Sequence, residues 1–397
     1  MSRSLLVILS LTNLLSYLDR YILASVLPLI EQELKLTKFE SGLLFGAFVP
    51  GYIIFSPLFG YLGDRLPRPR LMAAGVLLWG LATIMTGMTT SYVSLIVARL
   101  MIGTGEASFG AMAPGYLKDR IKDPVKLNSA LALFYAAIPC GSALGYVSGS
   151  LLAAAFSWHT AFVIAGAPGI IAGLWLFGLS EIADRDTSDI HLRSGFRLIF
   201  STPVMWCLIG GYVFNTYSLA GVAAFISFYG ESIGYSTQEI GTYFGITLVV
   251  AGFLGTFLGG RFASYLASGR RDPAATMLSY IGVTALCGVP FMLLAFTTGD
   301  KIIFTVACFI AELFIFAGVA PVNSVIVLLC PEKYVTLTVG VSIFMINLFG
   351  TLLSPAVVGW IADNLTLELG LQHLSGALLV SGLVWLYGAK IKRTAAT

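Results

Sequence analysis

Long hydrophobic runs alternate with short polar breaks along almost the whole chain. Most of the runs hold about 20 residues or more, which lets a helix cross the roughly 30 Å hydrocarbon core of a bilayer. The pattern predicts an all-α membrane protein with twelve transmembrane helices. Their expected limits are residues 4–30, 41–62, 70–88, 92–115, 128–153, 160–180, 203–229, 239–265, 273–297, 301–328, 335–361 and 370–389.

Composition agrees with a membrane protein. Hydrophobic residues make up 57% of the 397 residues and charged residues only 11%, whereas soluble domains carry about 25% charged residues. The net charge of +3 is small and scattered, so we expect no nucleic-acid partner. The five cysteines have no metal-ligand spacing, and we expect no metal and no cofactor.

The basic residues orient the predicted helices. Eighteen of the 23 Lys and Arg residues share one side if both termini are cytoplasmic, and the opposite loops hold only Lys35, Lys38 and Lys301. Cytoplasmic loops of membrane proteins are enriched in Lys and Arg. We therefore expect both termini to be cytoplasmic and the chain to lie in a cell membrane, namely a bacterial inner membrane.

The chain is expected to divide into two bundles of six helices. Residues 1–180 would form the first bundle, the polar residues 181–202 a cytoplasmic linker, and residues 203–397 the second bundle. A weak repeat supports the division, because the segment GYLGDRLPRPR (60–70) is echoed by GRFASYLASGR (260–270). Repeated helical halves are typical of secondary transporters.

Five ionisable residues lie well inside the predicted helices, where each charge exposed to lipid would cost about 2.5–3.5 kcal/mol at the bilayer centre. They are Asp19, Arg20, Arg99, Glu106 and Glu312. Four of them belong to the first and fourth predicted helices, and two acids balance two bases. We expect these four to face each other or a cavity.

Helical spacing supports a shared polar site. Thr12, Asn13, Ser16, Asp19 and Arg20 form one stripe, spaced by three, four and seven residues. On the fourth predicted helix, Arg99 and Glu106 lie seven residues apart on one face, and Gly103 and Gly105 between them would allow a neighbouring helix to come close.

These residue types suggest roles. Asp19 and Glu106 are proton-carrying candidates, because burial favours the neutral form of a carboxyl group and a nearby arginine favours the charged form. Arg20 is the first choice to bind an anionic head group, and Arg99 to organise the carboxylates. The alternative is a structural ion-pair lock without any proton or ligand role.

Glu312 has no charged partner in the second half of the chain, and Asn323 is the nearest polar residue on its helix. It is a further candidate for proton coupling, the alternative being a neutral or hydroxyl-bonded structural carboxyl group. Aromatic residues could line an apolar chamber beside the charges, although aromatics on membrane helices more often face lipid or pack between helices. The predicted substrate-binding residues are Arg20, Arg99, Asn13, Ser16, Tyr17, Phe48, Tyr135, Phe214, Tyr217 and Asn323.

The loop GYLGDRLPRPR resembles the signature between the second and third helices of the major facilitator superfamily. In that resemblance Gly60 would allow close helix packing, while Asp64, Arg65 and Arg68 would form part of a gate. Pro67 departs from the glycine usual in that family. The resemblance implies two six-helix bundles, with the first and fourth helices lining a central cavity.

Further motifs resemble the spinster branch of that superfamily, the lysolipid and sphingosine-1-phosphate transporters. They are YLDRY (17–21), RLMIGTGEAS (99–108), AIPCGSALGY (137–146) and SPAVVGWIAD (354–363). The resemblance implies a secondary active transporter that moves an amphiphilic anion by alternating access. We expect coupling to protons through Asp19 and Glu106.

Two other function classes were weighed. An enzyme is not expected, because the three histidines lie in predicted loops without metal-ligand spacing and no nucleophile motif is present. A proton-coupled multidrug or organic-anion antiporter of the same superfamily is the main alternative, since an acidic site would suit cationic drugs. The expected partners are a lipid or another amphiphilic small molecule and the bilayer itself, and the protein is expected to be a monomer.

Overall fold

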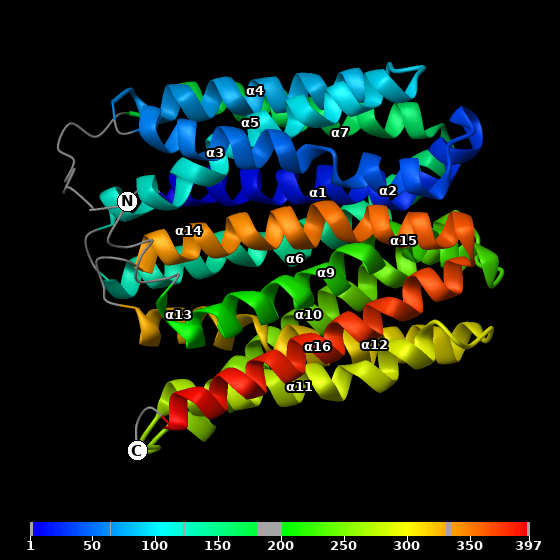
Figure 1. Cartoon of the computed structure of the whole chain (residues 1–397). Helices are drawn as coiled ribbons and strands as arrows, with labels where there is room; N and C mark the ends of the chain where they lie inside the picture. The colour runs from blue at the N-terminus through cyan, green and yellow to red at the C-terminus, as the bar shows by residue number, and fades with distance from the viewer. Residues whose placement is uncertain (1–2, 64, 122–123, 181–200, 331–334, 395–397) are drawn as a thin grey trace. The chain divides into compact units, whose positions relative to one another are not determined.

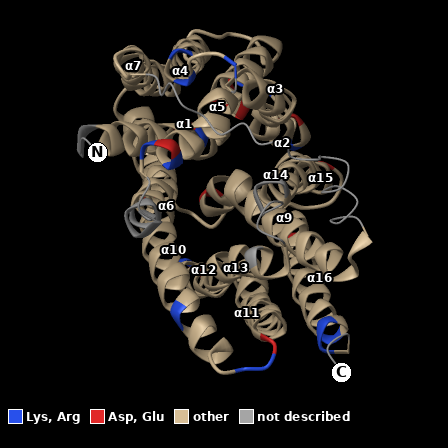
Figure 2. Cartoon of the chain, turned by 90° about the vertical axis from the view of Figure 1, so that its left-hand side faces the viewer, with Lys and Arg blue, Asp and Glu red and all other residues tan. Residues whose placement is uncertain are grey.

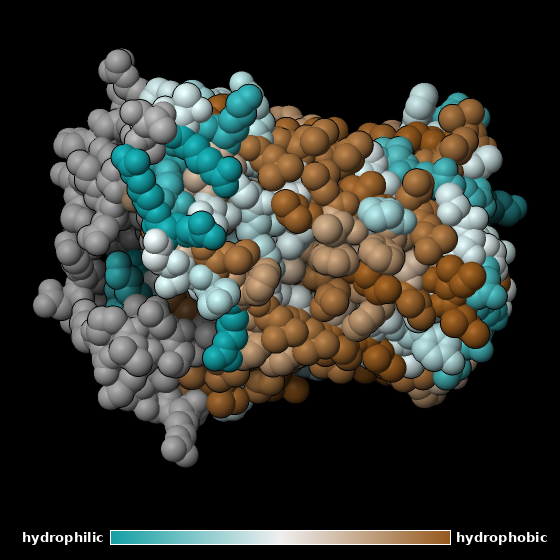
Figure 3. All heavy atoms as spheres, turned by 90° about the horizontal axis from the view of Figure 1, so that it is seen from below, coloured by the Kyte–Doolittle hydropathy of each residue, from teal (hydrophilic) through white to brown (hydrophobic). Residues whose placement is uncertain are grey.

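The computed structural model describes residues 3–63, 65–121, 124–180, 201–330 and 335–394, and every regular element among them is a helix. Twelve helical segments of this described part are long and apolar enough to cross a membrane. They coincide with the twelve predicted spans, so the predicted all-α membrane fold is confirmed. Much of the described surface that is visible in Figure 3 is hydrophobic.

The chain forms two compact units. Unit 1 contains Met1–Thr187 and Tyr235–Ile246, and unit 2 contains Ser188–Gly234 and Thr247–Thr397. The predicted linker, residues 181–202, lies outside the described residues except for its last two positions.

Unit 1 is built from long helices that pack in pairs (Figure 1). Helix α1 packs on α6, α4 packs on α7, and both α3 and α4 pack on α5. The helices are α1 (Arg3–Leu34), α2 (Lys38–Gly46), α3 (Phe48–Gly63), α4 (Arg68–Thr86), α5 (Tyr92–Arg120), α6 (Pro124–Ala155) and α7 (Trp158–Phe177).

Three glycines of α6 explain why α1 lies so close to it. A Cβ atom at Gly141 or Gly145 would collide with the backbone of α1, and one at Gly149 with the Ser25 side chain. Small residues at such positions allow membrane helices to approach to backbone contact. This contact fixes α1, which carries the polar stripe.

Unit 2 centres on α16, which packs on both α9 and α11, with α12 against α11 (Figure 1). Its helices are α9 (Pro203–Ser232), α10 (Thr237–Ala267, whose first residues belong to unit 1), α11 (Pro273–Ala295), α12 (Lys301–Ala317), α13 (Val319–Leu329), α14 (Val335–Met345), η2 (Ile346–Leu352), α15 (Leu353–Asn364) and α16 (Leu367–Thr394).

Three predicted spans are interrupted rather than continuous. The span predicted over 41–62 breaks at Ala47, between α2 and α3, and the one over 301–328 breaks at Gly318, between α12 and α13. The span over 335–361 contains the π-helical segment η2. Hydropathy does not detect the first two breaks, because Ala47 and Gly318 are apolar or small; Pro50 and Pro321, three residues after them, cannot donate to the carbonyls of Gly46 and Ala317.

Candidate functional site

Two glycines of α5 bring its neighbours to the polar stripe. A Cβ atom at Gly103 would collide with the backbone of Phe48 on α3, and one at Gly105 with the backbone of Gly75 and Trp79 on α4. The expected close approach at these two glycines is therefore confirmed. As a result, the side chains of Phe48 and Trp79 reach the charged residues of α1 and α5.

Glu106 of α5 and Arg20 of α1 form a tight ion pair. Arg20 Nη2 lies 2.7 Å from Glu106 Oε2, and Arg20 Nε donates to the same oxygen at 2.8 Å. Ser16 Oγ, one turn earlier on α1, donates to Glu106 Oε1 at 2.7 Å. Both carboxylate oxygens of Glu106 are thus satisfied, by charge-assisted hydrogen bonds that are stronger than neutral ones.

Arg20 is also enclosed by aromatic rings. Its guanidinium carbon lies 4.5 Å from the centroid of Phe48, 4.9 Å from that of Tyr17 and 5.4 Å from that of Tyr52. Such cation–π contacts stabilise a partly desolvated cation. The Arg20 side chain is 15% exposed while that of Glu106 is 1% exposed, so Arg20 is the member of this pair that an incoming ligand can touch.

Asp19 and Arg99 form a second, much looser pair. Arg99 Nη1 lies 4.0 Å from Asp19 Oδ2, and both side chains are buried. The indole Nε1 of Trp79 donates to Asp19 Oδ2 at 3.1 Å. Among the described residues, Asp19 Oδ1 and all three guanidinium nitrogens of Arg99 lack a hydrogen-bond partner.

These four residues (Asp19, Arg20, Arg99 and Glu106) form one buried group, which we call the charge cluster. Its two ion pairs differ in how completely their carboxylates are hydrogen-bonded. One carboxylate has every oxygen bonded, whereas the other keeps one buried oxygen open. Buried polar atoms without partners are costly and mark functional positions. The structure thus brings together all four residues that the sequence predicted to meet, all within unit 1. Charged residues are few elsewhere along the helices (Figure 2).

The other predicted binding residues of unit 1 lie around α1 and α6. Asn13 is buried and its Nδ2 donates to the Phe134 carbonyl at 2.8 Å, which ties α1 to α6. Tyr135 is 49% exposed and packs edge-on against Phe134. Asn13 therefore has a structural contact, while Tyr135 is half exposed.

The predicted residues of unit 2 do not form one group. Among the described residues, Glu312 is buried and its Oε2 has no hydrogen-bond partner. Asn323 is exposed and bonds the Val319 carbonyl of its own helix at 3.0 Å. The Tyr217 hydroxyl lies 3.1 Å from His373 Nε2, and Phe214 is 38% exposed. Of the histidines expected in loops, His159 lies in the first turn of α7, and His373 lies within α16, inside the predicted span 370–389.

The predicted gating loop is described only in part. Asp64 lies outside the described residues. Arg65 stacks over the Tyr61 ring, and Arg68 pairs with Asp119 at 2.6 Å and donates to the Gly63 carbonyl at 3.1 Å. The prediction of close helix packing at Gly60 is wrong within unit 1, because a Cβ atom at Gly60 would contact none of the described atoms.

Gly63, and not Gly60, allows α3 to pack closely against α5. A Cβ atom at Gly63 would press on Met112 of α5, whereas none of the described atoms lies within 4 Å of the corresponding position at Gly60. The glycine that faces α5 is therefore one turn later on α3 than the resemblance implied.

Two functional residues were missed from the sequence. Trp79 donates to Asp19, and a signal was available, because a tryptophan buried in a membrane helix needs an acceptor for its N–H. Tyr52 lies four residues after Phe48 on α3, so the same helix face carries both rings that contact Arg20.

Comparison with known proteins identifies a matching family and several relatives. A model of the Major Facilitator Superfamily matches residues 9–355. The zebrafish (Danio rerio) sphingosine-1-phosphate transporter SPNS2 is 28% identical over 392 residues, covering 90% of this chain and 75% of that protein. Human protein spinster homolog 1 is 29% identical over 395 residues, covering 92% of this chain and 74% of that protein.

The fruit-fly (Drosophila melanogaster) protein spinster is 30% identical over 287 residues, or 68% of this chain, and the chain spans only 46% of that relative. Among solved structures, a bacterial homologue of the human lysosomal transporter spinster, in an inward-facing and unoccupied conformation, shares the fold. Its TM-score is 0.87 at 20% identity, covering 98% of this chain and 96% of that one.

Proposed function

We propose a function from one premise: this chain belongs to the major facilitator superfamily, and within it to the spinster-type transporters. It is a transporter and not an enzyme. The proposal is that it moves an amphiphilic anion, such as a lysophospholipid or a sphingosine-1-phosphate-like lipid, by alternating access. In this proposal, the transport is coupled to the binding and release of protons at the charge cluster.

The observation that carries the proposal is the charge balance of the cluster. With Asp19 and Glu106 both ionised, the two carboxylates neutralise Arg20 and Arg99, and the buried site has no net charge. One added proton leaves one positive charge in excess. Because an unbalanced charge inside a membrane is costly, the protonated cluster favours an anion and the deprotonated cluster does not.

The two carboxylates then have different roles. We place the exchanging proton on Asp19, because its Oδ1 is buried and has no partner among the described residues. Glu106 stays ionised as the counterion of Arg20, since both of its oxygens already accept hydrogen bonds. This assignment is narrower than the sequence prediction, which gave both acids the same role.

Arg20 is the proposed ligand of the anionic head group. Its guanidinium is the partly exposed end of the cluster, and its planar donors suit phosphate oxygens. Phe48, Tyr17 and Tyr52 around it offer an apolar wall for the start of a lipid tail. Arg99 is fully buried and lies 4.0 Å from Asp19, so we propose that it positions the Asp19 carboxylate and does not contact the ligand.

A cationic drug is the second candidate cargo, coupled by antiport with protons. The specific observation in its favour is that the cluster contains two carboxylates and that aromatic rings surround it, since both attract organic cations. In that case the proton and the cargo would compete for the cluster, whereas an anion and a proton would bind together.

The proposed setting follows from the basic loops. We place the protein in a bacterial inner membrane with both termini in the cytoplasm, acting as a monomer with protons as the coupling ion and no other cofactor.

Uptake into proteoliposomes tests the proposal. The purified protein is reconstituted and offered a lysophospholipid, a sphingoid phosphate and a cationic dye, each with and without an imposed proton gradient. We expect the two anionic lipids to be transported and the proton gradient to change their rate. Transport of the dye alone would favour the antiporter, and uptake that ignores the gradient would remove the proton from the mechanism.

A further inference from the structure

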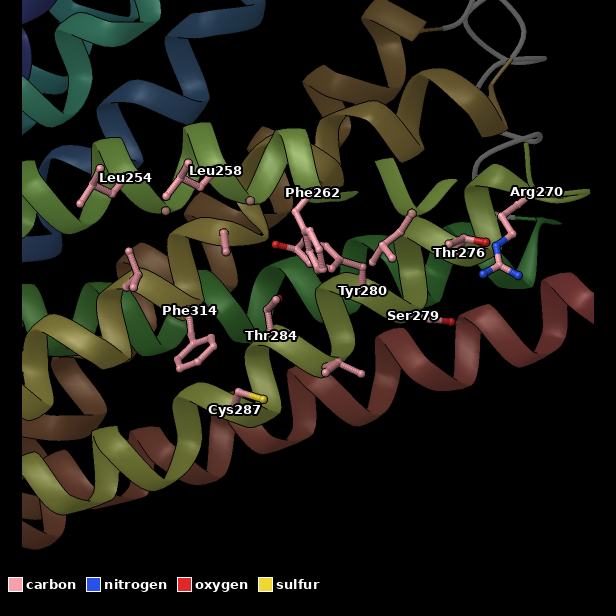
Figure 4. Close-up of a pocket in the computed structure, with 16 residues that line it drawn as sticks. Leu254, Leu258, Phe262, Arg270, Thr276, Ser279, Tyr280, Thr284, Cys287 and Phe314 are labelled. Carbon is pink, nitrogen blue, oxygen red and sulfur yellow. The ribbon is translucent and has the colours of Figure 1, made fainter. Parts of the chain in front are cut away.

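Unit 2 contains a groove that the transport proposal does not use. It lies among α10, α11 and α12 and encloses a volume of about 600 Å³ (Figure 4). All of its lining residues lie between Leu254 and Ala317, so the whole groove belongs to one unit. None of the residues of the charge cluster contributes to it.

Most of the groove is apolar and open to the surroundings of the unit. Leu258 and Phe262 of α10 are 55% and 54% exposed, and Val283 of α11 is 50% exposed. Phe262 and Tyr280 meet edge to face across it, with ring centroids 5.9 Å apart. In a membrane-spanning segment such a surface faces acyl chains rather than water.

One end of the groove is polar and positively charged. Figure 4 places the Arg270 guanidinium beside Thr276 and Ser279, at the end opposite Leu254. Arg270 is the last residue of the degenerate second copy of the loop motif, and Arg271 follows it.

The other charged groups near this end leave its positive charge in place. Arg393 of α16 donates from Nη2 to Ser279 Oγ at 2.9 Å, which adds a second cation beside the groove. Asp272 is the nearby carboxylate, and its Oδ1 accepts from the Ala275 amide at 3.0 Å as the cap of α11.

The length of the groove matches one leaflet of a bilayer. Leu254 and Leu266 are twelve residues apart on α10, which corresponds to about 18 Å along the helix axis. One leaflet contributes about half of the roughly 30 Å hydrocarbon core. A chain that starts at Arg270 and follows the groove therefore ends near the middle of the membrane.

We propose that this groove binds an anionic phospholipid of the membrane, with one acyl chain along α10 and the phosphate at Arg270. Basic pockets between membrane helices are suited to such head groups. A small polar ligand would find few donors or acceptors in the apolar part. The site is separate from the cargo site and does not depend on what the protein transports.

Native mass spectrometry of the purified full chain tests the charged end. Wild type is titrated with phosphatidylglycerol and with phosphatidylcholine, and we expect at least one tightly held phosphatidylglycerol that phosphatidylcholine does not replace. Arg270→Gln should weaken that binding about fivefold, the equivalent of about 1 kcal/mol per basic residue near the membrane surface. Arg271→Gln, which removes the neighbouring charge outside the lining, is the matched control and should leave the binding unchanged.

The apolar part is tested by filling it. Val283→Trp should remove the bound phosphatidylglycerol, whereas Val306→Trp on α12, equally exposed at 51% but outside the lining, should keep it. Glycerol phosphate should not compete, because it lacks the acyl chain.

Four outcomes would overturn the proposal. They are equal binding of the two lipids to wild type, equal effects of the two arginine variants, retention of the lipid by Val283→Trp, and displacement of the lipid by glycerol phosphate. A mass corresponding to two chains that Val283→Trp abolishes would show instead that a second copy covers the groove.

Discussion

The two units carry buried charge in opposite ways. Unit 1 holds four ionisable residues that pair with one another and sum to zero. Unit 2 buries Glu312, whose Oε2 has no hydrogen-bond partner among the described residues. Paired charges can gain or lose a proton and change the net charge that a ligand meets, whereas a solitary carboxyl group in an apolar bundle is most stable when neutral. On this difference we base the proposal that proton coupling belongs to unit 1.

A second contrast lies inside the charge cluster. Glu106 accepts two hydrogen bonds, from Ser16 and Arg20, and forms a 2.7 Å ion pair with Arg20, while Asp19 accepts one hydrogen bond from Trp79 and lies 4.0 Å from the Arg99 guanidinium. On this difference we base the proposal that Glu106 is the counterion and Asp19 the proton site. Three substitutions test these two differences, and their expected effects decrease from Arg20→Ala through Trp79→Phe to Glu312→Gln.

Arg20→Ala is expected to have the largest effect. It removes one charge-assisted hydrogen bond, worth about 1.5–3 kcal/mol, together with the ion pair, and leaves Glu106 buried without its counterion. Binding and uptake of an anionic lysolipid should fall about 100-fold or more, which corresponds to about 2.7 kcal/mol. The measurement is equilibrium binding of a radiolabelled lysolipid to purified protein, together with uptake into proteoliposomes.

Two further variants keep that result interpretable. Arg271→Ala removes an exposed arginine of unit 2, outside both the charge cluster and the predicted gate, and should bind like wild type. Arg20→Lys retains the charge without the planar fork and should recover only part of the affinity. If Arg20→Ala folds and binds within a factor of two of wild type, the guanidinium does not bind the head group.

Trp79→Phe should have an intermediate effect. It keeps the aromatic packing against Gly105 but removes the hydrogen bond to Asp19. A hydrogen bond to a charged group contributes about 1.5 kcal/mol or more, so proton-driven uptake should fall about tenfold. Uptake driven by the cargo gradient alone should change less.

Trp158→Phe is the matched control for Trp79→Phe. Its indole donates to Glu33 Oε2 at 2.7 Å, the same type of bond in the same unit but outside the cluster. Equal losses in the two variants would show that the effect comes from losing any indole hydrogen bond and not from Asp19.

Glu312→Gln should have the smallest effect. A neutral amide replaces a carboxyl group that we take to be neutral already, so proton-driven uptake should stay within about a factor of two, which is less than 0.5 kcal/mol. A complete loss of the response to a proton gradient, with the protein still folded, would place coupling in unit 2 and end the contrast between the two units.

The fold was predictable because membrane burial leaves few alternatives. Hydrophobic length alone located all twelve spans, since backbone groups in lipid must be bonded within helices. The breaks at Ala47 and Gly318 were missed although the sequence carries a signal for both. Pro50 and Pro321 each follow the break by three residues, and a proline has no N–H to donate to the carbonyl four residues earlier, here that of Gly46 or Ala317.

The charge cluster was predictable for a similar reason. Four charges inside membrane helices must find one another, and spacing of three, four and seven residues placed each pair on a helix face. What spacing could not give was the unequal pairing. That inequality depends on Gly103 and Gly105, which set how closely Phe48 and Trp79 approach, and hence on interhelical distances that a sequence does not contain.

The central claim is that a proton on Asp19 prepares the cluster for an anion. The direct test is the pH dependence of lysophosphatidylglycerol binding to wild type and Asp19→Asn between pH 5 and 8. This lipid is suitable because its phosphodiester does not change charge over that range, unlike a phosphate monoester. We predict that wild-type affinity rises as pH falls, and that Asp19→Asn, which cannot ionise, binds with one high affinity at every pH. An Asp19→Asn variant that keeps the wild-type pH dependence would contradict the account.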